Sequence, residues 1–526
     1  MREFNVTGLC VPEKHYMVDT SDNLKKITEL ITKGKYFVIN RPRQYGKTTT
    51  LSCLRRLLKD EYIVVSISFE RLGYKNFETA ENFCIEFLRL VRKSLNSANI
   101  SDEYKEAWVN NEVNSIIKLD YHIDKMCEDQ KIVLMIDEVD KTSNNQVFLE
   151  FLSMLRAKYL ARDDGDDYTF HSVILASVYN IKNIKLKLIN EGYYTPQNAE
   201  GNRVNSPWNI AVEFNVDMSF NPQDIESMLK EYENETKLLM DTESISHEIY
   251  KYTSGYPFLV SYICKLIDEE LGRNWSIDGV LRAVKIVLSR DNTLFDDLIK
   301  NIEIYKELYD LLYSILILGK NEPYNIDNNI IKLGSMFGFI KEESESKKVI
   351  ISNKIFEIRI SNYFISKDST SEFYKDKISR TLPEDVIKNN TFDMELVLSK
   401  FSDHYREIYN KVDVPFLERH GRLLFLTFLK PLINGKGFYH IESQFTDYRR
   451  MDIVVDFNKD QFIIELKIWD GDKSREKAYD QLLDYMNSKN ADKGYLLIFD
   501  FRKKKNKEQV SEWIQIGNKK IFSILV

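Results

Sequence analysis

The sequence has few cysteines, and their arrangement would neither bind a metal nor require an oxidising compartment. Its five cysteines are widely scattered, without a C-x-x-C pair: Cys10, Cys53, Cys84, Cys127 and Cys264. Cysteine zinc sites need closely spaced pairs, and small secreted domains join their cysteines in disulfides. The seven histidines are dispersed as well. We therefore exclude a cysteine zinc site of the usual spacing and expect a reducing compartment.

Long hydrophobic runs are also missing. The stretch MREFNVTGLCVPEKHYMVD has no apolar core of the kind found in signal peptides. The apolar segments near 311–318 and 423–433 are too short or too interrupted to cross a bilayer, which takes about 20 apolar residues. Internal repeats and low-complexity tracts are absent. The expected location is the cytoplasm, without a membrane partner.

The chain also lacks an excess of positive charge. Its formal net charge of −7 excludes a uniformly basic nucleic-acid-binding protein but not a local basic surface. Residues 401–526 carry slightly more basic than acidic side chains, whereas the rest of the chain is acidic. The segment FRKKKNK (501–507) either contacts phosphates or simply faces solvent. A polyanionic partner is therefore expected at the C-terminal part.

What the sequence does contain is a series of apolar, β-branched segments that alternate with helical ones. A chain of 526 residues, 43% of them hydrophobic, has apolar material for about two to four domains. We predict strands in these segments: 35–40, 61–69, 131–140, 171–180 and 209–216. Helical segments such as 79–95 lie between them. This alternation predicts an α/β domain with a parallel sheet covered on both faces.

The later part of the chain changes in character. From about 221 to 370 helical patterns dominate, followed by a small hairpin, which resembles a winged helix. The polar stretch around 366–391 is predicted to be a linker. The predicted domains are therefore 1–220, 221–370 and 390–526.

The segment RPRQYGKTTTL (41–51) has the chemistry of a phosphate-binding loop. Lys47 and Thr48 follow a predicted strand and open a predicted helix. A triphosphate needs converging backbone N–H groups, a lysine for its charge and a hydroxyl on Mg²⁺. The first glycine of the pattern G-x-x-x-x-G-K-(S/T) is replaced by Arg41, which tolerates fewer backbone conformations. The sequence alone therefore leaves open how tightly the loop wraps a phosphate.

Two acidic residues about 90 positions further on complete the pattern. In IVLMIDEVD a buried strand delivers Asp137 and Glu138 at its C-terminal end. In an ATP site Asp137 would hold Mg²⁺, directly or through water, and Glu138 would polarise the attacking water. Acids also follow buried strands simply because the chain re-enters solvent. Both motifs together, in this order, favour nucleotide binding over that alternative.

These residues resemble the P-loop ATPases of the AAA and STAND kind, more closely the AAA-ATPase-like family and its archaeal-type relatives. There the loop commonly reads R-P-R-R-F-G-K-S or G-P-R-R-x-G-K-T, and RPRQYGKT shares the Arg-Pro-Arg start. The resemblance therefore makes Arg41 a family variant and implies ATP and Mg²⁺ as cofactors. The nucleotide-binding residues that it implies are Arg43, Gly46, Lys47, Thr48, Thr49, Asn180 and Pro257, and Thr48 and Asp137 would bind the metal.

Two further segments support the resemblance. The strand VILASVYN would place Ser177 or Asn180 beside the γ-phosphate as a sensor, with a plain strand end as the alternative. Gly255-Tyr256-Pro257 resembles the G-x-P motif of STAND lids, whose proline packs near the nucleotide, with an ordinary helix-starting turn as the alternative. Arg203 and Arg290 are unranked candidates for an arginine finger. AAA relatives often form rings, so the resemblance includes a homo-oligomer among the partners.

The C-terminal part places charged residues inside apolar strands. RRMDIVVDF predicts a strand with Asp452 at its start, and QFIIELKIWD predicts the next strand, with Glu465 and Lys467 on one face and Leu466 towards the core. Two converging carboxylates can hold Mg²⁺ against a scissile phosphate, and a lysine beside them can activate water or stabilise negative charge. A hairpin with solvated charges is the alternative, although charge is costly inside such apolar strands.

This pattern resembles the D…E-x-K signature of the PD-(D/E)xK nucleases. Downstream, Gln481 and Tyr485 match the Q-x-x-x-Y helix motif of the RecB-like branch, and upstream Glu418 or Glu442 would be an accessory acid. One departure is YRRMD where the family usually has G-R-x-D. The resemblance implies nucleic acid, preferably DNA, as the partner. It implies catalytic roles for Asp452, Glu465, Lys467 and Gln481, the first two as metal ligands.

The sequence therefore predicts an α/β protein with a P-loop parallel-sheet ATPase domain, a helical and winged-helix lid and a C-terminal α/β PD-(D/E)xK nuclease-like domain. The expected activity is that of an ATP-dependent, Mg²⁺-dependent nuclease, with Glu138 catalytic in ATP hydrolysis. The alternative is an ATP-operated switch whose C-terminal domain holds nucleic acid or another partner without cutting it. A third alternative, a structural adaptor with neither activity, would leave both motif sets unexplained. The resemblance suggests a role in defence against foreign DNA or in maintenance of mobile elements.

Overall fold

The computed structural model describes residues 2–139, 146–178, 212–213, 218–318, 320–369, 383–388, 391–409, 418–433, 437–443, 451–458, 460–469, 471–500 and 511–526. The chain forms two compact units. The first comprises Met1–Ile277 with Met336–Gly338, and the second comprises Asp278–Ser335 with Phe339–Val526. The three predicted domain ranges stay a prediction. None of the helices in these ranges is both long and apolar enough to span a bilayer.

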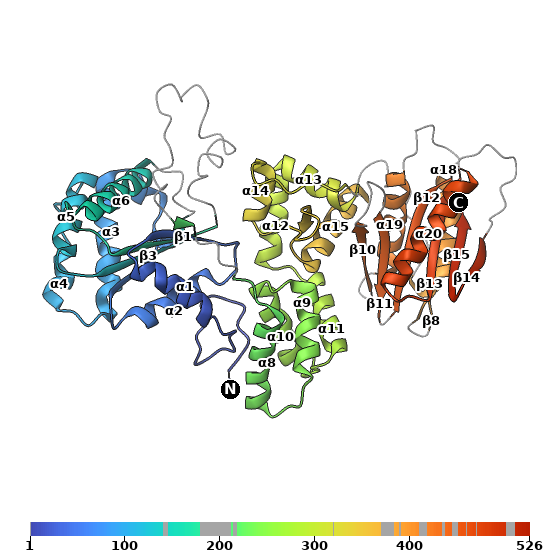
Figure 1. Cartoon of the computed structure of the whole chain (residues 1–526), viewed down its shortest axis with the longest axis horizontal. Helices are drawn as coiled ribbons and strands as arrows, with labels where there is room; N and C mark the ends of the chain where they lie inside the picture. The colour runs from blue at the N-terminus through green and yellow to red at the C-terminus, as the bar shows by residue number, and fades with distance from the viewer. Residues whose placement is uncertain are drawn as a thin grey trace, which may run out of the picture. The chain divides into compact units, whose positions relative to one another are not determined.

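The first unit is built on a parallel sheet whose strands lie within the predicted apolar segments (Figure 1). The strands are β1 (Tyr36–Asn40), β2 (Ile63–Ser68), β3 (Ile132–Asp137), β4 (Ser172–Ser177) and β5 (Val212–Glu213). Their order is β2-β3-β4-β1-β5, and all neighbours are parallel. All positions of β3 and β4 are buried, which explains their continuous apolar sequences. The carboxyl ends of β1, β4 and β3 therefore meet at one edge of the sheet.

Helices cover both faces of this sheet, as predicted (Figure 1). One face carries α1 (Ser21–Thr32) and α2 (Lys47–Leu58), whose apolar side chains join those of the strands. The other carries α3 (Ala80–Ser94), α5 (Ile116–Cys127) and α6 (Gln146–Asp164). The segment between α3 and α5 includes the short α4 (Asp102–Ala107). In α3 the buried side chains recur every three or four residues, and Thr79 caps its first turn, which explains why this segment forms a helix.

A buried lysine that the sequence analysis did not single out joins α5 to α6. Lys158 of α6 is 1% exposed, and its ammonium donates to Asp120, Asp124 and Asp167 at 2.7, 2.5 and 2.8 Å. Burial works against the charge of Lys158, but the hydrogen bonds to these carboxylates outweigh it, and the pKa of Lys158 is raised. The three carboxylates lie close enough together to hold a metal ion. Because the Lys158 ammonium already binds all three, we assign them to an ion cluster.

Replacing Lys158 by Met is expected to lower the local free energy of unfolding of α5 and α6 by about 3 kcal/mol, because three carboxylates would lose their common counter-ion. Hydrogen exchange of the amides of these two helices in the full chain measures this effect. The matched control is Asp120→Asn, which leaves Lys158 the carboxylates of Asp124 and Asp167 and should change the stability by less than about 1 kcal/mol at pH 7. Unchanged exchange in Lys158→Met would contradict the assignment.

The same cluster predicts a pH dependence. Burial and the neighbouring Asp167 carboxyl raise the pKa of Asp124 from 3.8 to about 6, although Lys158 acts in the opposite direction. At Asp124 the folded state therefore binds more protons than the unfolded state between about pH 4 and pH 6, and the contribution of Asp124 to stability is lost as the pH rises through that range. Burial acts to raise the pKa of Asp167, but its hydrogen bonds with Asp124 and Lys158 lower that pKa, so the contribution of Asp167 has the opposite sign. Asp124→Asn should remove the slope that Asp124 contributes.

Three helices complete the described fold of the first unit: α8 (Pro222–Thr236), α9 (Thr242–Thr253) and α10 (Pro257–Glu269). The N-terminal segment packs on them, because the rings of Phe4 and Tyr16 contact Tyr232 of α8 at centroid distances of 5.3 and 5.2 Å. The same segment contacts α2, where the backbone N–H of Cys10 donates to Thr49 Oγ1 at 3.3 Å. We call α8, α9 and α10 the lid helices. The N-terminal segment therefore links the lid helices to α2, the helix that follows the predicted phosphate loop.

The second unit begins with helices and a small antiparallel hairpin, as predicted for 221–370. These elements are α11 (Ile277–Ser289), α12 (Thr293–Ile304), α13 (Lys306–Leu316), α14 (Asn329–Met336), β6 (Ile340–Glu342), β7 (Val349–Ile351) and α15 (Lys354–Ser369). The predicted linker 366–391 is partly structured. It contains the end of α15 and the short elements α17 (Pro383–Val386) and β8 (Ile387–Lys388), and β9 (Thr391–Phe392) follows.

The C-terminal part of the second unit is an α/β sandwich (Figure 1). Its elements are α18 (Met394–Tyr409), α19 (Glu418–Ile433), β10 (Gly437–Ser443), β11 (Met451–Phe457), β12 (Asp460–Ile468), α20 (Asp472–Ser488), β13 (Lys493–Phe499), β14 (Ser511–Ile516) and β15 (Lys519–Leu525). The sheet order is β10-β11-β12-β13-β15-β14. The central strands β12, β13 and β15 are parallel, and the outer pairs are antiparallel.

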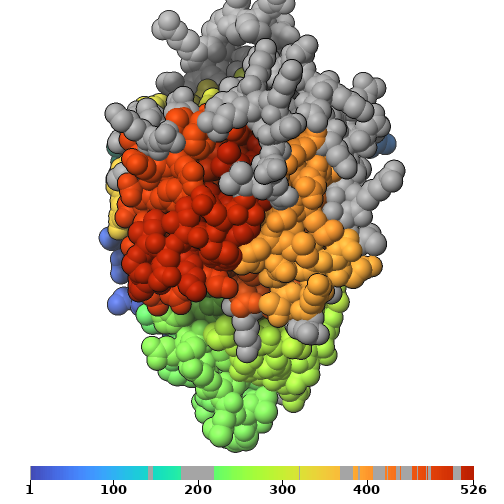
Figure 2. Space-filling model, turned by 90° about the vertical axis from the view of Figure 1, so that its right-hand side faces the viewer, coloured from blue at the N-terminus to red at the C-terminus, as the bar shows by residue number. Residues whose placement is uncertain are grey.

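Both faces of this sheet are covered. Leu482 and Met486 of α20 pack against one face, on which Leu496 of β13 lies. The other face carries Phe499, whose ring contacts Phe401 of α18. Figure 2 shows this unit from the side, with the orange surface around α18 beside the red surface of the last strands. Charged residues inside these strands are therefore enclosed by helices rather than exposed on an open sheet.

Candidate nucleotide and nuclease sites

The predicted phosphate loop connects β1 to α2 at the edge where β1, β4 and β3 end. β1 ends at Asn40 and α2 begins at Lys47. The backbone N–H of Arg41 donates to the carbonyl of Ser177 at the end of β4, at 3.1 Å, which ties the loop to the neighbouring strand. The loop positions with a positive φ are Gln44 at 56° and Gly46 at 81°. Arg41 has no positive φ, so an arginine fits where the pattern has glycine without backbone strain.

Gly46 and Lys47 have the features that a phosphate requires. Gly46 precedes the first turn of α2, and a Cβ built on it meets no atom within 4 Å, so the space above the helix end is open. The first N–H groups of a helix lack intrahelical acceptors, which makes this end suitable for an anion. Lys47 is 7% exposed, and its ammonium donates to the carbonyls of Arg41 and Pro42 at 2.9 and 3.0 Å. The positive charge is therefore held inside the loop itself.

Thr48 and Asp137, 89 positions apart in the sequence, are in direct contact. The Thr48 hydroxyl donates to Asp137 Oδ2 at 2.7 Å. Asp137 is 7% exposed at the end of β3, and its Oδ1 accepts the backbone N–H of Glu138 at 2.9 Å. Glu138 has a φ of 56°, a left-handed conformation that few residues other than glycine adopt. The fold thus brings a hydroxyl and a carboxylate together beside Lys47, with a second carboxylate next in the chain.

The other predicted residues of the nucleotide site do not take part in the contact between Thr48 and Asp137. Arg43 is exposed on the loop, and the hydroxyl of Thr49 accepts the N–H of Cys10. Ser177 is 1% exposed at the end of β4, paired with Asn40 of β1. Two predicted residues, Asn180 and Arg203, lie outside the described residues. Arg290 is exposed in the second unit.

Tyr256, in the turn before α10, contacts the phosphate loop. The nucleotide contact of its neighbour Pro257 stays a prediction. Pro257 is the first residue of α10, and Tyr256 directly precedes it. The Tyr256 hydroxyl donates to the carbonyl of Arg43, and its ring meets that of Tyr45 edge-on at a centroid distance of 4.8 Å. Sequence reasoning did not single out Tyr256, because the G-x-P motif does not specify its middle position.

In the second unit, Glu465 and Lys467 lie together on β12, as alternation predicts. Glu465 is 1% exposed and Lys467 3%, and Lys467 Nζ lies 2.6 Å from Glu465 Oε1. Among the residues that the structure describes, Lys467 Nζ has no hydrogen-bond acceptor at suitable geometry, so the contact is an ion pair. Leu466 is buried as predicted, but so is the face that carries the charges, because Ile463 on the same face packs against α20. The alternative of solvated charges on a hairpin is therefore wrong.

Asp452 lies at the start of β11, as predicted, and its backbone pairs with Glu442 of β10. The ladder between β11 and β12 begins with Ile453 opposite Ile464. Extending that register by one residue brings position 452 opposite position 465. The side chains of Asp452, Glu442 and Glu418 lie outside the described residues.

The predicted Q-x-x-x-Y motif lies on α20. Tyr485 is 8% exposed and belongs to the same apolar cluster as Ile463 and Leu482. Gln481 lies one turn earlier, and its Oε1 is buried with no hydrogen-bond partner among the described side chains and backbone groups. A buried amide oxygen normally has a donor, so this position suits a ligand or a bound water. The helix therefore presents an open polar group on the face that also covers Glu465 and Lys467.

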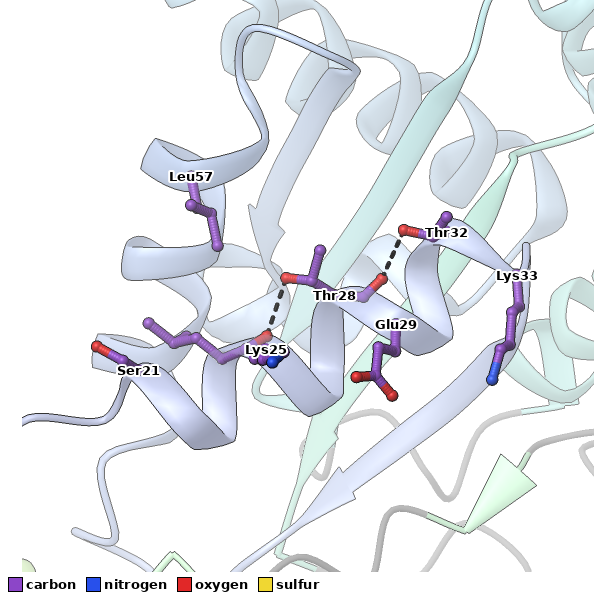
Figure 3. Close-up of a pocket in the computed structure, with 8 residues that line it drawn as sticks. Ser21, Lys25, Thr28, Glu29, Thr32, Lys33 and Leu57 are labelled. Atoms are coloured by element: carbon purple, nitrogen blue, oxygen red, sulfur yellow. Dashed lines mark hydrogen bonds between the residues drawn. The ribbon is translucent and has the colours of Figure 1, made fainter.

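A separate hollow of about 480 Å³ lies between α1 and the C-terminal end of α2 (Figure 3). It contains none of the predicted site residues; its lining is Ser21, Leu24, Lys25, Thr28, Glu29, Thr32, Lys33 and Leu57. The hydroxyls of Thr28 and Thr32 donate to backbone carbonyls of their own helix. Leu57 lies at the opposite end of α2 from Lys47, so we do not assign the nucleotide to this hollow.

Comparison with solved structures finds similar chains of low sequence identity. The Walker-type ATPase PABY2304 of Pyrococcus abyssi is 13% identical, and the match covers 68% of this chain and 99% of that chain, with a TM-score of 0.46. The Thermotoga maritima RuvB Holliday junction branch migration motor is 13% identical over 65% and 94%, with a TM-score of 0.32. The Aeropyrum pernix ORC2 protein is 12% identical over 66% and 93%, with a TM-score of 0.33. No curated protein matches the chain.

Two family models match the chain in the regions where the two sites lie. The model of the PD-(D/E)XK nuclease superfamily matches residues 438–511, which include β11, β12 and α20. The model of the AAA-like domain matches residues 10–364, which include the phosphate loop, β3 and the G-x-P turn. The predicted resemblances at both ends of the chain are thereby confirmed. Since the second match spans more than half of the 526 residues, the chain belongs to the AAA-like domain family and carries a C-terminal domain of the PD-(D/E)XK nuclease superfamily.

Proposed function

We propose that the protein binds and hydrolyses ATP at the phosphate loop and cleaves nucleic acid, preferably DNA, at the C-terminal site. The observation that carries the first half is the 2.7 Å contact between Thr48 and Asp137 beside the buried Lys47. A hydroxyl and a carboxylate in contact at the end of a parallel sheet are the oxygen ligands that a Mg²⁺–nucleotide complex requires.

In the ATP site, Lys47 would neutralise the phosphates, and the N–H groups around Gly46, Thr48 and Thr49 would bind their oxygens. Thr48 and Asp137 would hold Mg²⁺, which neutralises charge on the phosphates. Glu138 would accept the hydrogen bond of the attacking water and orient it. Arg43, Asn180 and Pro257 are assigned to nucleotide binding from the family pattern.

In the C-terminal site, Asp452 and Glu465 would hold Mg²⁺, which supplies charge stabilisation at the scissile phosphate. The described residues fit this role, because Glu465 is buried next to a lysine and the β11–β12 register brings Asp452 to its level. Lys467 would stabilise the negative charge that develops during cleavage, and Gln481 would bind the backbone or the active-site strand. The family resemblance suggests DNA as the substrate, self-association and a role in defence or mobile-element maintenance. A cytoplasmic location is proposed from the scattered cysteines and the short apolar runs.

One observation favours the alternative of an ATP-operated switch that does not cut. The ion pair between Glu465 and Lys467 is buried, so that Glu465 already has a counter-ion and a metal would have to displace it. If this pair never opens, the C-terminal domain would hold nucleic acid without hydrolysing it.

Glu138→Gln tests the ATPase half of the proposal. The amide keeps the size of the side chain but cannot orient water as a carboxylate does. We therefore expect ATP binding to remain within about threefold and hydrolysis to fall about 100-fold. Titration calorimetry measures the binding and phosphate release the hydrolysis, and Glu128→Gln at the exposed end of α5 is the control. Unchanged hydrolysis in Glu138→Gln would refute the assigned role.

A further inference from the structure

Three successive carbonyl groups of the phosphate loop accept hydrogen bonds from side chains. Lys47 donates to the carbonyls of Arg41 and Pro42, and Tyr256 donates to that of Arg43. A loop that directs its N–H groups towards a phosphate turns carbonyls away from it, and these need other donors. Two of these three hydrogen bonds are therefore donated by the loop lysine, and the third is donated by the lid tyrosine.

Tyr256 is held in place by the turn in which it lies. It is 3% exposed, and the two residues before it, Ser254 and Gly255, have left-handed φ values of 45° and 72°. The Gly255 carbonyl accepts the N–H of Phe220 at 2.9 Å, and a Cβ on Gly255 would lie 1.9 Å from the Phe220 carbonyl oxygen. Pro257 fixes the backbone on the other side. Tyr256 thus presents its hydroxyl from a rigid support.

The two kinds of donor differ in what happens when a nucleotide enters. The Lys47 ammonium cannot remain on the carbonyls of Arg41 and Pro42 and also give all its donors to phosphate oxygens. The Tyr256 hydroxyl, in contrast, comes from the turn before α10 rather than from the loop, and its acceptor is the backbone carbonyl of Arg43, which as an acceptor offers no donor to a phosphate. Once Lys47 turns to the phosphates, Tyr256 is the donor that continues to hold the loop backbone.

We propose that Tyr256 is a positioning residue for ATP, which keeps the phosphate loop in its phosphate-accepting shape through the carbonyl of Arg43. This inference rests on the proposed ATP site and adds to it a lid residue outside the phosphate-loop and metal-binding motifs. The edge-on contact with Tyr45 supports it, because the same side chain also fixes the ring next to Gly46.

Tyr256→Phe tests the proposal, since it keeps the ring and the contact with Tyr45 but removes the hydroxyl. Without the hydroxyl, the loop would adopt its phosphate-accepting shape in a smaller fraction of the molecules. The apparent affinity for ATP would fall in proportion to that fraction. One hydrogen bond corresponds to about a three- to tenfold increase in the Kd of ATP. Because the loop serves ground state and transition state alike, KM should rise by the same factor while kcat stays within about twofold.

The matched control is Tyr232→Phe. Tyr232 is also a buried lid tyrosine, and its hydroxyl donates to Asp268 at 2.6 Å, within the lid and away from the loop. Both variants lose one hydroxyl hydrogen bond, so both should lower the melting temperature slightly. Only Tyr256→Phe should weaken ATP binding. Equal Kd values in the two variants, or a fall in kcat at unchanged Kd in Tyr256→Phe, would overturn the inference.

The wild-type chain separates this inference from the proposed function. If wild type shows no binding of MgATP by calorimetry, the proposed ATP site itself is wrong. If wild type binds MgATP and Tyr256→Phe binds it equally well, the ATP site stands and the positioning role falls.

Discussion

ATP hydrolysis is expected to fall about 10²- to 10³-fold when Lys47 is replaced by Met, the size of effect seen when one preorganised electrostatic group is removed from a reacting centre. Lys47 is the buried cation of the phosphate loop, and Met fills a similar volume without the charge. In the absence of nucleotide the variant also loses the bonds to the carbonyls of Arg41 and Pro42. ATP binding should therefore weaken together with hydrolysis, and both are measured on the full chain.

Lys59→Met is the control for this experiment. Lys59 follows the last residue of the same helix, α2, and is exposed, so its replacement removes an identical charge far from the loop. We expect hydrolysis within about twofold of wild type, because a surface charge at a helix end contributes little. If Lys47→Met retained more than a tenth of wild-type hydrolysis while Lys59→Met behaved as expected, the phosphate loop would not be the ATP site.

The second large effect is expected at the buried ion pair of the C-terminal domain. Replacing both members, as Glu465→Gln with Lys467→Met, should abolish nucleic-acid cleavage, a loss of more than about 100-fold. The double variant removes both charges at once, so neither is left buried without its counter-ion. The melting temperature of the domain should therefore change little. Lys467→Met alone leaves the Glu465 carboxylate uncompensated and should destabilise the domain by about 3 kcal/mol.

Exposed residues of α20 supply the matched controls. Glu476→Gln with Lys477→Met makes the same chemical changes on the surface of the same domain. Cleavage by this variant should equal that of wild type. If the double variant of β12 still cleaves, with a melting temperature equal to that of wild type, the buried pair is structural, and the catalytic assignment of Glu465 and Lys467 is wrong.

The sequence was sufficient for the strands of the first sheet and for the position of the phosphate loop between a strand and a helix. β3 and β4 could be predicted because strands buried on both faces have continuous apolar sequences. Thr48 and Asp137 could be paired because parallel strands bring their carboxyl ends to one edge. Arg41 shows the limit of the motif: its backbone conformation decides whether a glycine is needed there, and the sequence does not give that conformation.

Contacts between distant polar residues could not be predicted. Lys158 looked like any helical lysine, and only the fold brings three aspartates to its ammonium. Tyr256 lies in a recognised motif, but its partner is a backbone carbonyl 213 positions away, which has no signature in the sequence. For Glu465 and Lys467 alternation gave the shared face. It did not give the burial of that face, which depends on α20 packing over it.

The most direct test of the central claim is a cleavage assay on single-stranded DNA, double-stranded DNA and RNA in the presence of Mg²⁺, with and without ATP. The assay compares wild type with Lys47→Met and with the Glu465→Gln and Lys467→Met double variant. We predict that wild type cuts DNA in an ATP-dependent manner, that the double variant does not cut, and that Lys47→Met no longer responds to ATP. A wild-type protein that binds ATP but cuts none of these substrates would contradict the nuclease and leave the ATP-operated switch.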